Sequence, residues 1–201
     1  MNKVLYIKAN AKSEELSRTF KISESFIEAY REAHPEDEIT TLDLYNEGID
    51  FLTKGNLDTV NKREEGEDKN HPILKYAYQF LEADKYVIAE PLWNLGVPAI
   101  LKAYIDYISA NGITFKYTES GPVGLCTGKK AINITSRGGN YDTEPSASFE
   151  MGDRYLKAIF AFLGITDFAT ISADGLDVIE NNTDKIVEEA IMVAKTTARN
   201  F

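Results

Sequence analysis

Short apolar runs alternate with amphipathic helical segments along the chain, and this alternation restricts the fold more than any other feature of the sequence. Strand-like runs occupy residues 3–9, 38–45, 86–89, 131–135 and 169–172. Helical periodicity occupies residues 17–33, 73–81, 99–109, 151–163 and 182–199. Neighbouring parallel strands need long crossover connections, which helices supply. The pattern therefore predicts an α/β fold, a doubly wound sheet of five parallel strands with helices on both faces.

Local signals refine this prediction in several places. The run Tyr86–Ala89 is apolar without alternation, as expected of a central strand that is covered on both faces. Thr183 is expected to cap the start of the last helix. Residues 113–117, followed by the turn signal Ser120–Pro122, predict a small excursion or a hairpin. Residues 46–70 are polar and charged, and we expect a loop with a short exposed helix there.

The composition predicts one acidic domain over residues 1–201. The chain has 22 Lys and Arg against 32 Asp and Glu, which gives a net charge of −10. This charge disfavours nucleic acid as a partner. Any anionic ligand has to be held by a local arrangement of hydrogen-bond donors and positive charge. No apolar run reaches the ~20 residues of a membrane span, and the single cysteine, Cys126, excludes an intramolecular disulfide. His34 and His71 lack metal-ligand spacing, so we expect a cytoplasmic protein without a metal site or a membrane partner.

Ligands of doubly wound sheets bind at the carboxyl ends of the strands, so the loops after the first, third and fourth strands are candidate sites. The first of these loops, residues 10–17, has no glycine and lacks the G-x-G-x-x-G pattern of dinucleotide-binding domains. Ser17, Arg18 and Thr19 open the following helix, where free backbone N–H groups and two hydroxyls suit an anion. The alternative is an ordinary helix N-cap with a solvated arginine. Asn10 is either a turn former or a ligand donor.

The other two loops carry aromatic and glycine signals. Residues 90–98 hold the only tryptophan, Trp93, beside Asn94, at a strand end where a planar ring can lie against the backbone. Core packing of Trp93 is the alternative. Residues 136–139 (SRGG) expose bare backbone N–H groups, and Arg137 adds a positive charge. The alternative there is a flexible hinge.

Common catalytic patterns are absent from the sequence. It contains no G-x-S-x-G and no H-E-x-x-H, and residues 124–130 have the wrong spacing for a Walker A loop. No histidine, cysteine or acidic pair in the strand-end loops is placed to act as an obligatory acid, so we assign no catalytic residue. An anion site, an aromatic loop and a glycine loop without a catalytic dyad suit a redox cofactor that carries its own chemistry. Flavin mononucleotide (FMN) fits that outline.

Three blocks in order resemble the family of FMN-dependent NADH azoreductases and NADH:quinone oxidoreductases. They are residues 91–95 (PLWNL), residues 112–118 with 121–125, and residues 128–139, and the likeness extends from residues 1–5 to residues 163–167. The resemblance implies a flavodoxin-like fold with strand order 2-1-3-4-5, non-covalent FMN, NADH as electron donor, and a homodimer with sites at the subunit interface. The implied activity is ping-pong reduction of quinones and reductive cleavage of azo compounds.

The same resemblance implies roles for individual residues. Residues 17–19 would hold the FMN phosphate, residues 92–95 would run along the isoalloxazine ring, and residues 136–139 would meet its pyrimidine edge. The expected cofactor-binding residues are Asn10, Ser17, Arg18, Thr19, Pro91, Leu92, Trp93, Asn94, Leu95, Ser136, Arg137, Gly138 and Gly139. Tyr117 is expected to reach the partner's site, where it would contact substrate.

Two positions depart from the family pattern. Asn10 follows Ala9 where many members have hydroxyl residues, and Leu95 replaces an aromatic residue of some members. Two other functions stay open alongside the flavin reductase. One is a flavodoxin-type electron carrier without a substrate pocket, and the other is a non-enzymatic α/β regulatory module.

Overall fold

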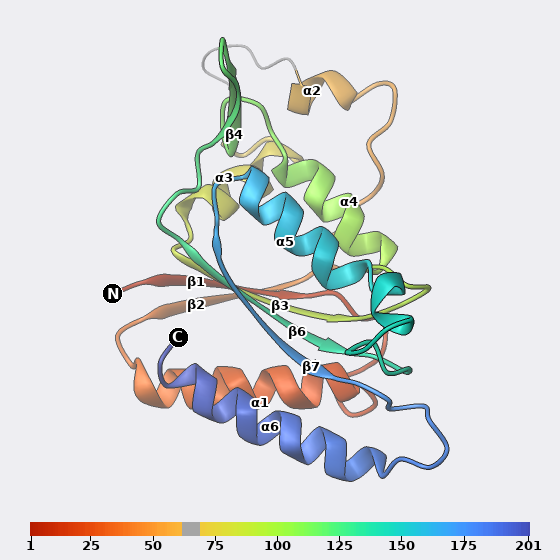
Figure 1. Ribbon diagram of the computed structural model, residues 1–201. Helices are drawn as coiled ribbons and strands as arrows, with labels where there is room; N and C mark the ends of the chain where they lie inside the picture. Colours follow the sequence, from red (N-terminus) through yellow and green to blue (C-terminus); the bar gives the residue numbers. More distant parts are fainter. Residues whose placement is uncertain (62–68) are drawn as a thin grey trace.

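The computed structural model describes residues 1–61 and 69–201, and one parallel β-sheet forms its centre (Figure 1). The five strands lie in the order β2-β1-β3-β6-β7. Their bounds are β1 Lys3–Lys8, β2 Glu38–Asp43, β3 Lys85–Pro91, β6 Lys130–Ser136 and β7 Asp167–Ala173. Renumbered within this sheet, the order is 2-1-3-4-5, so the predicted fold class and strand order are confirmed.

Helices cover both faces of the sheet (Figure 1). One face carries α1 (Arg18–Ala33) and α6 (Thr183–Ala198), which lie side by side. The other face carries α3 (Leu74–Glu82), α4 (Ala99–Ile108) and α5 (Gly152–Phe162). Two short helices, α2 (Leu57–Asn61) and the 3₁₀ helix η1 (Ser146–Phe149), lie in the connections. No helix of the described ranges is long and apolar enough to cross a membrane.

A hydrophobic core lies on each face of the sheet, and side chains of β3 enter both cores. Tyr86 and Ile88 pack into the core under α3, α4 and α5, whereas Val87 and Ala89 pack into the core under α1 and α6. Successive side chains of a strand point to opposite faces, so a strand covered on both sides needs an uninterrupted apolar run. The prediction of a central strand at these residues is confirmed.

The predicted hairpin is also present. Strands β4 (Phe115–Thr118) and β5 (Gly121–Gly124) pair in antiparallel fashion. A Cβ atom at Gly124 would lie 2.2 Å from backbone atoms of Leu163 and Gly164, so β5 lies directly against the backbone at the end of α5. Glycine is required at this position because no side chain has room there.

Three details differ from the sequence prediction or extend it. The N-cap of α6 is Asn182, whose Oδ1 accepts from the backbone N–H of Lys185 at 3.1 Å, so the prediction of Thr183 was wrong. Thr183 already has helical geometry, and its hydroxyl donates to the carbonyl of Leu176 at 3.0 Å. The polar connection after β6 contains η1. Helix α2 confirms the short helix expected within residues 46–70, of which residues 62–68 lie outside the described residues.

We expect Gly124→Ala to lower the free energy of unfolding by about 1–3 kcal/mol, because the new methyl group has to push two backbone segments apart. Urea denaturation followed by circular dichroism measures the change. Gly55→Ala is the matched control, because the nearest atom to a Cβ there, Thr53 Oγ1, is 3.8 Å away. Equal stability of the two variants would contradict the close contact between β5 and α5.

Candidate functional site

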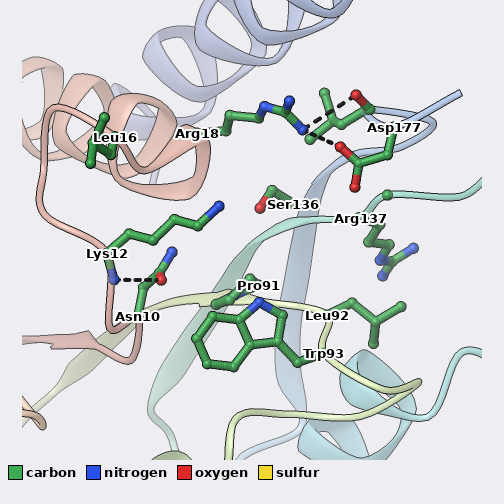
Figure 2. Close-up of a pocket in the computed structure, with 12 residues that line it drawn as sticks. Asn10, Lys12, Leu16, Arg18, Pro91, Leu92, Trp93, Ser136, Arg137 and Asp177 are labelled. Carbon is green, nitrogen blue, oxygen red and sulfur yellow. Dashed lines mark hydrogen bonds and ion pairs between the residues drawn. The ribbon is translucent and has the colours of Figure 1, made fainter. Parts of the chain in front are cut away.

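A cleft of about 230 Å³ opens at the carboxyl ends of β1, β3 and β6, where the strand order reverses (Figure 2). It is lined by Asn10, Lys12, Leu16, Arg18, Pro91, Leu92, Trp93, Ser136, Arg137, Gly138, Leu176 and Asp177. The structure therefore brings together the three loops that the sequence identified and adds the loop after β7. Of the expected cofactor-binding residues, those in the same loops but outside the lining are Ser17, Thr19, Asn94, Leu95 and Gly139.

The start of α1 is held in place by polar side chains of the first loop. Ser17 is the N-cap, and its Oγ accepts from a backbone N–H of the first turn at 3.1 Å and from Asn10 Nδ2 at 2.8 Å. Asn10 Oδ1 accepts in turn from the backbone N–H of Lys12 at 3.0 Å, so Asn10 also shapes the loop. The hydroxyl of Thr19 lies 2.6 Å from that of Ser136. The first turn of α1 contains no acidic residue, which preserves the positive end of the helix dipole.

Arg18 is paired rather than fully solvated. Its Nη1 donates to Asp177 Oδ1 at 2.7 Å and to the carbonyl of Leu176 at 3.3 Å (Figure 2). The Arg18 side chain is 42% exposed and that of Asp177 is 71% exposed. The pair joins the start of α1 to the loop after β7 at the edge of the cleft.

The loop after β3 makes a strained turn. Trp93 and Gly96 exchange backbone hydrogen bonds of 2.9 and 3.0 Å, and the two residues between them, Asn94 and Leu95, have φ values of 51° and 69°. Asn adopts such left-handed backbone readily, but Leu does so at a cost of about 1–2 kcal/mol. Strain of this kind is concentrated at ligand sites. Trp93 is 37% exposed and turns toward the cleft in Figure 2, so it is not a buried core residue.

Arg137 lines the cleft but does not act as an isolated positive charge. Its side chain is buried, with the guanidinium 3.7 Å from Glu150 Oε1 and 3.5 Å from Asp174 Oδ2. Glu150 precedes α5 and Asp174 follows β7, so the guanidinium ties together three connections of the site. Arg137 was expected to bring positive charge to this edge of the cleft. The two carboxyl groups that face its guanidinium offset part of that charge.

Glu90, at the end of β3, joins this buried group. It is fully buried, and burial raises the pKa of its carboxyl to about 7, although Thr135, Asn133 and the charge of Arg137 act in the opposite direction. Repulsion from Glu150 adds to the effect of burial.

Asp174 behaves in a similar way. Burial, together with a hydrogen bond to the carboxyl of Asp142, raises the pKa of Asp174 to about 7, against the attraction of Arg137. Two carboxyl groups next to the cleft therefore gain or lose protons near neutral pH.

Sequence reasoning missed Glu90, Asp174 and Asp177 as members of the site. Glu90 begins the predicted loop of residues 90–98, and the signal for its role is an acidic residue directly after the apolar run Tyr86–Ala89. Asp174 and Asp177 lie in the loop after the fifth strand, which is not one of the three loops predicted to hold a ligand. Tyr117 is 69% exposed on the hairpin and does not line the cleft of its own chain.

The family model described as flavodoxin-like fold matches residues 2–196. The chain therefore belongs to the flavodoxin-like family. It is 63% identical over 201 residues, 100% of both chains, to FMN-dependent NADH:quinone oxidoreductase 2 of Clostridium acetobutylicum. It is 57% identical, again over 100% of both chains, to FMN-dependent NADH:quinone oxidoreductase of Caldicellulosiruptor saccharolyticus.

Solved structures agree with this grouping. The azoreductase from Bacillus anthracis str. Sterne superposes with a TM-score of 0.91 at 38% identity and covers 100% of both chains. The FMN-dependent NADH-azoreductase from Bacillus anthracis str. Ames Ancestor, in complex with FMN, has a TM-score of 0.89 at 31% identity and covers 100% of this chain and 99% of that one. The family resemblance found in the sequence blocks is confirmed.

The buried carboxyl of Glu90 predicts a pH-dependent stability. Its pKa is about 7 in the folded chain and has an ordinary value of 4.5, so the folded chain binds more protons between these limits. The contribution of Glu90 to the free energy of unfolding therefore falls as pH rises from about 4.5 to 7, by up to about 3 kcal/mol. Glu90→Gln removes this titration, so relative to the parent it should become progressively more stable between pH 5 and pH 8.

Urea denaturation of both proteins at the two pH values measures this difference. Glu36→Gln, at an exposed position, is the control and should change equally little at both pH values. A stability difference between Glu90→Gln and the parent that is independent of pH would show that the Glu90 carboxyl does not titrate in this range.

Proposed function

We propose that the chain is an FMN-dependent oxidoreductase that uses NADH to reduce quinones by two electrons and to cleave aromatic azo compounds. One observation carries the proposal: the chain matches, at 63% identity over its full length, a protein named for the quinone activity. The cleft can accommodate such a cofactor, because it lies where the strand order of the sheet reverses, and doubly wound folds bind their ligands at this point.

The residues of the cleft fit the parts of FMN. A phosphate needs N–H donors and positive charge, which the start of α1 offers through Ser17, Arg18 and Thr19, with no acidic residue in the first turn. A flat ring needs an exposed edge of backbone, which the turn at residues 93–96 offers. A polar ring edge needs close backbone donors, which residues 136–139 offer because their glycines carry no side chain.

FMN, when bound, supplies the hydride chemistry of the reaction. The residues of the chain bind and orient it and shape the space above it. The charged residues of the described lining are Lys12, Arg18, Arg137 and Asp177, and we assign none of them a proton-transfer role. NADH and the acceptor then use the same open side of the cleft in turn, which is the basis of a ping-pong reaction.

The reaction can be tested on the purified chain. With FMN bound it should be yellow, lose its visible absorbance when NADH is added under argon, and regain it with a quinone. Initial rates with NADH and a quinone should give parallel double-reciprocal lines. Intersecting lines would contradict the ping-pong order, bleaching without quinone turnover would favour an electron carrier, and failure to bind FMN would contradict the flavin proposal itself.

We also propose that the chain forms a homodimer in the cytoplasm. Large apolar side chains are exposed beside the cleft, at Trp93, Leu95, Phe149 and Met151. The backbone N–H of Met151 donates to the carbonyl of Leu95 at 2.9 Å, so the two segments that carry them are neighbours. A second copy covering this group would remove apolar surface from water and close the cleft. Tyr117, which does not line the cleft of its own chain, would then come from the partner.

Sedimentation at micromolar concentration should give twice the monomer mass of 22.5 kDa. Met151→Glu places a charge in the proposed contact and should raise the dimer dissociation constant at least tenfold. Met192→Glu is the matched control, because Met192 is 62% exposed, against 52% for Met151, but lies on α6, on the opposite face of the sheet from α5. A fully active monomer, or equal weakening by both substitutions, would contradict this interface.

A further inference from the structure

The pairing of Arg18 with Asp177 places a carboxylate at the position where the cleft would hold an anion. Arg18 extends from the start of α1 and meets Asp177 with Nη1 and Oδ1 2.7 Å apart (Figure 2). Of the described residues that line the cleft, Asp177 is the only one with a carboxyl group. Arg18, the cation at the start of α1, is thus already paired with a carboxylate of the chain itself.

Backbone hydrogen bonds hold the segment that carries Asp177 beside the cleft. The N–H of Asp177 donates to the carbonyl of Gly138 at 2.9 Å, and the N–H of Leu176 donates to that of Arg137 at 3.1 Å. A Cβ atom at Gly138 would lie 2.6 Å from Asp177 Oδ2, so the carboxylate lies directly over this backbone. A ligand that draws the Arg18 side chain away therefore leaves the negative charge of Asp177 at the edge of the cleft.

Asp177 and a bound phosphate would compete for Arg18, and the phosphate would have only a limited advantage. Both side chains of the pair are substantially exposed, so the ion pair is weak. A phosphate monoester carries a charge of about −1.5 to −2 and also receives the N–H groups at the start of α1. It can displace the carboxylate, but Asp177 then loses its partner and lies close to the phosphate with the same sign of charge.

We propose that Asp177 is a specificity-determining residue, whose carboxylate competes with the flavin phosphate for Arg18 and so limits the preference of the cleft for FMN over the uncharged riboflavin. The inference rests on the proposed flavin function and on the phosphate lying at the start of α1. It makes Asp177 a determinant of how firmly the cofactor is retained.

The test measures dissociation constants of FMN and riboflavin for the flavin-free chain by fluorescence titration. Asp177→Asn keeps the shape of the side chain and removes the charge. It should tighten FMN about 3- to 10-fold and leave riboflavin unchanged within about twofold. Asp184→Asn, an exposed acid in the first turn of α6, is the control for net charge and should change neither constant.

Arg18→Gln completes the test. It should weaken FMN without weakening riboflavin, and in the Arg18→Gln, Asp177→Asn double variant most of the gain from Asp177→Asn should disappear, because the two residues act through one contact. Equal tightening of both flavins by Asp177→Asn, or no tightening of FMN, overturns the role of Asp177 while leaving the flavin function intact. If the parent binds neither flavin, the proposed function fails. If it binds both equally, and Arg18→Gln leaves FMN unchanged, the phosphate position fails, and with it the inference.

Discussion

Parallel pairing of β1, β3, β6 and β7 is the constraint on which the cleft depends. The ladders run in step to their carboxyl ends, with Ala89 opposite Lys8, Ser136 opposite Pro91, and Ala173 opposite Ser136. The connections that follow must therefore leave the sheet at one edge, however far apart they are in sequence. Backbone hydrogen bonds continue the ladders into these connections, for example from Leu92 to the carbonyl of Ser136 at 3.0 Å. The site is built mostly from positions that the sheet fixes.

Burial of Arg137 adds an electrostatic condition to this geometry. A guanidinium without partners would be costly in the interior, and Glu150 and Asp174 remove that cost by facing it. The compensation is not constant, since both Asp174 and nearby Glu90 have a pKa of about 7. Protonation of these carboxyls on the acid side of neutrality leaves the Arg137 charge less compensated. The field at the glycine loop therefore depends on pH in the physiological range.

Periodicity in the sequence was enough to predict the elements of the sheet, because apolar runs such as Tyr86–Ala89 report burial directly. The strand order came from the family resemblance, since no local pattern states which strands are neighbours. The ligand loops were predictable as strand ends, but their contacts were not. In the sequence, Asp177 is indistinguishable from any other acidic loop residue, and only the fold shows that it pairs with Arg18. Leu95 occupies left-handed backbone that its own propensity disfavours, so only its surroundings explain the turn.

An acidic chain that binds an anionic cofactor must do so through short-range interactions. Charges separated by more than a Debye length, about 8 Å at physiological salt, are largely screened, so the net charge of −10 hardly reaches into the cleft. The electrostatic potential in the cleft is therefore set mainly by the few charged and polar groups that line it. We propose that the start of α1, with Arg18, favours a phosphate there and that Asp177 opposes it from the loop after β7. In our proposal, affinity for the cofactor therefore depends on a contact between two exposed side chains, which single substitutions can change without disturbing the sheet beneath.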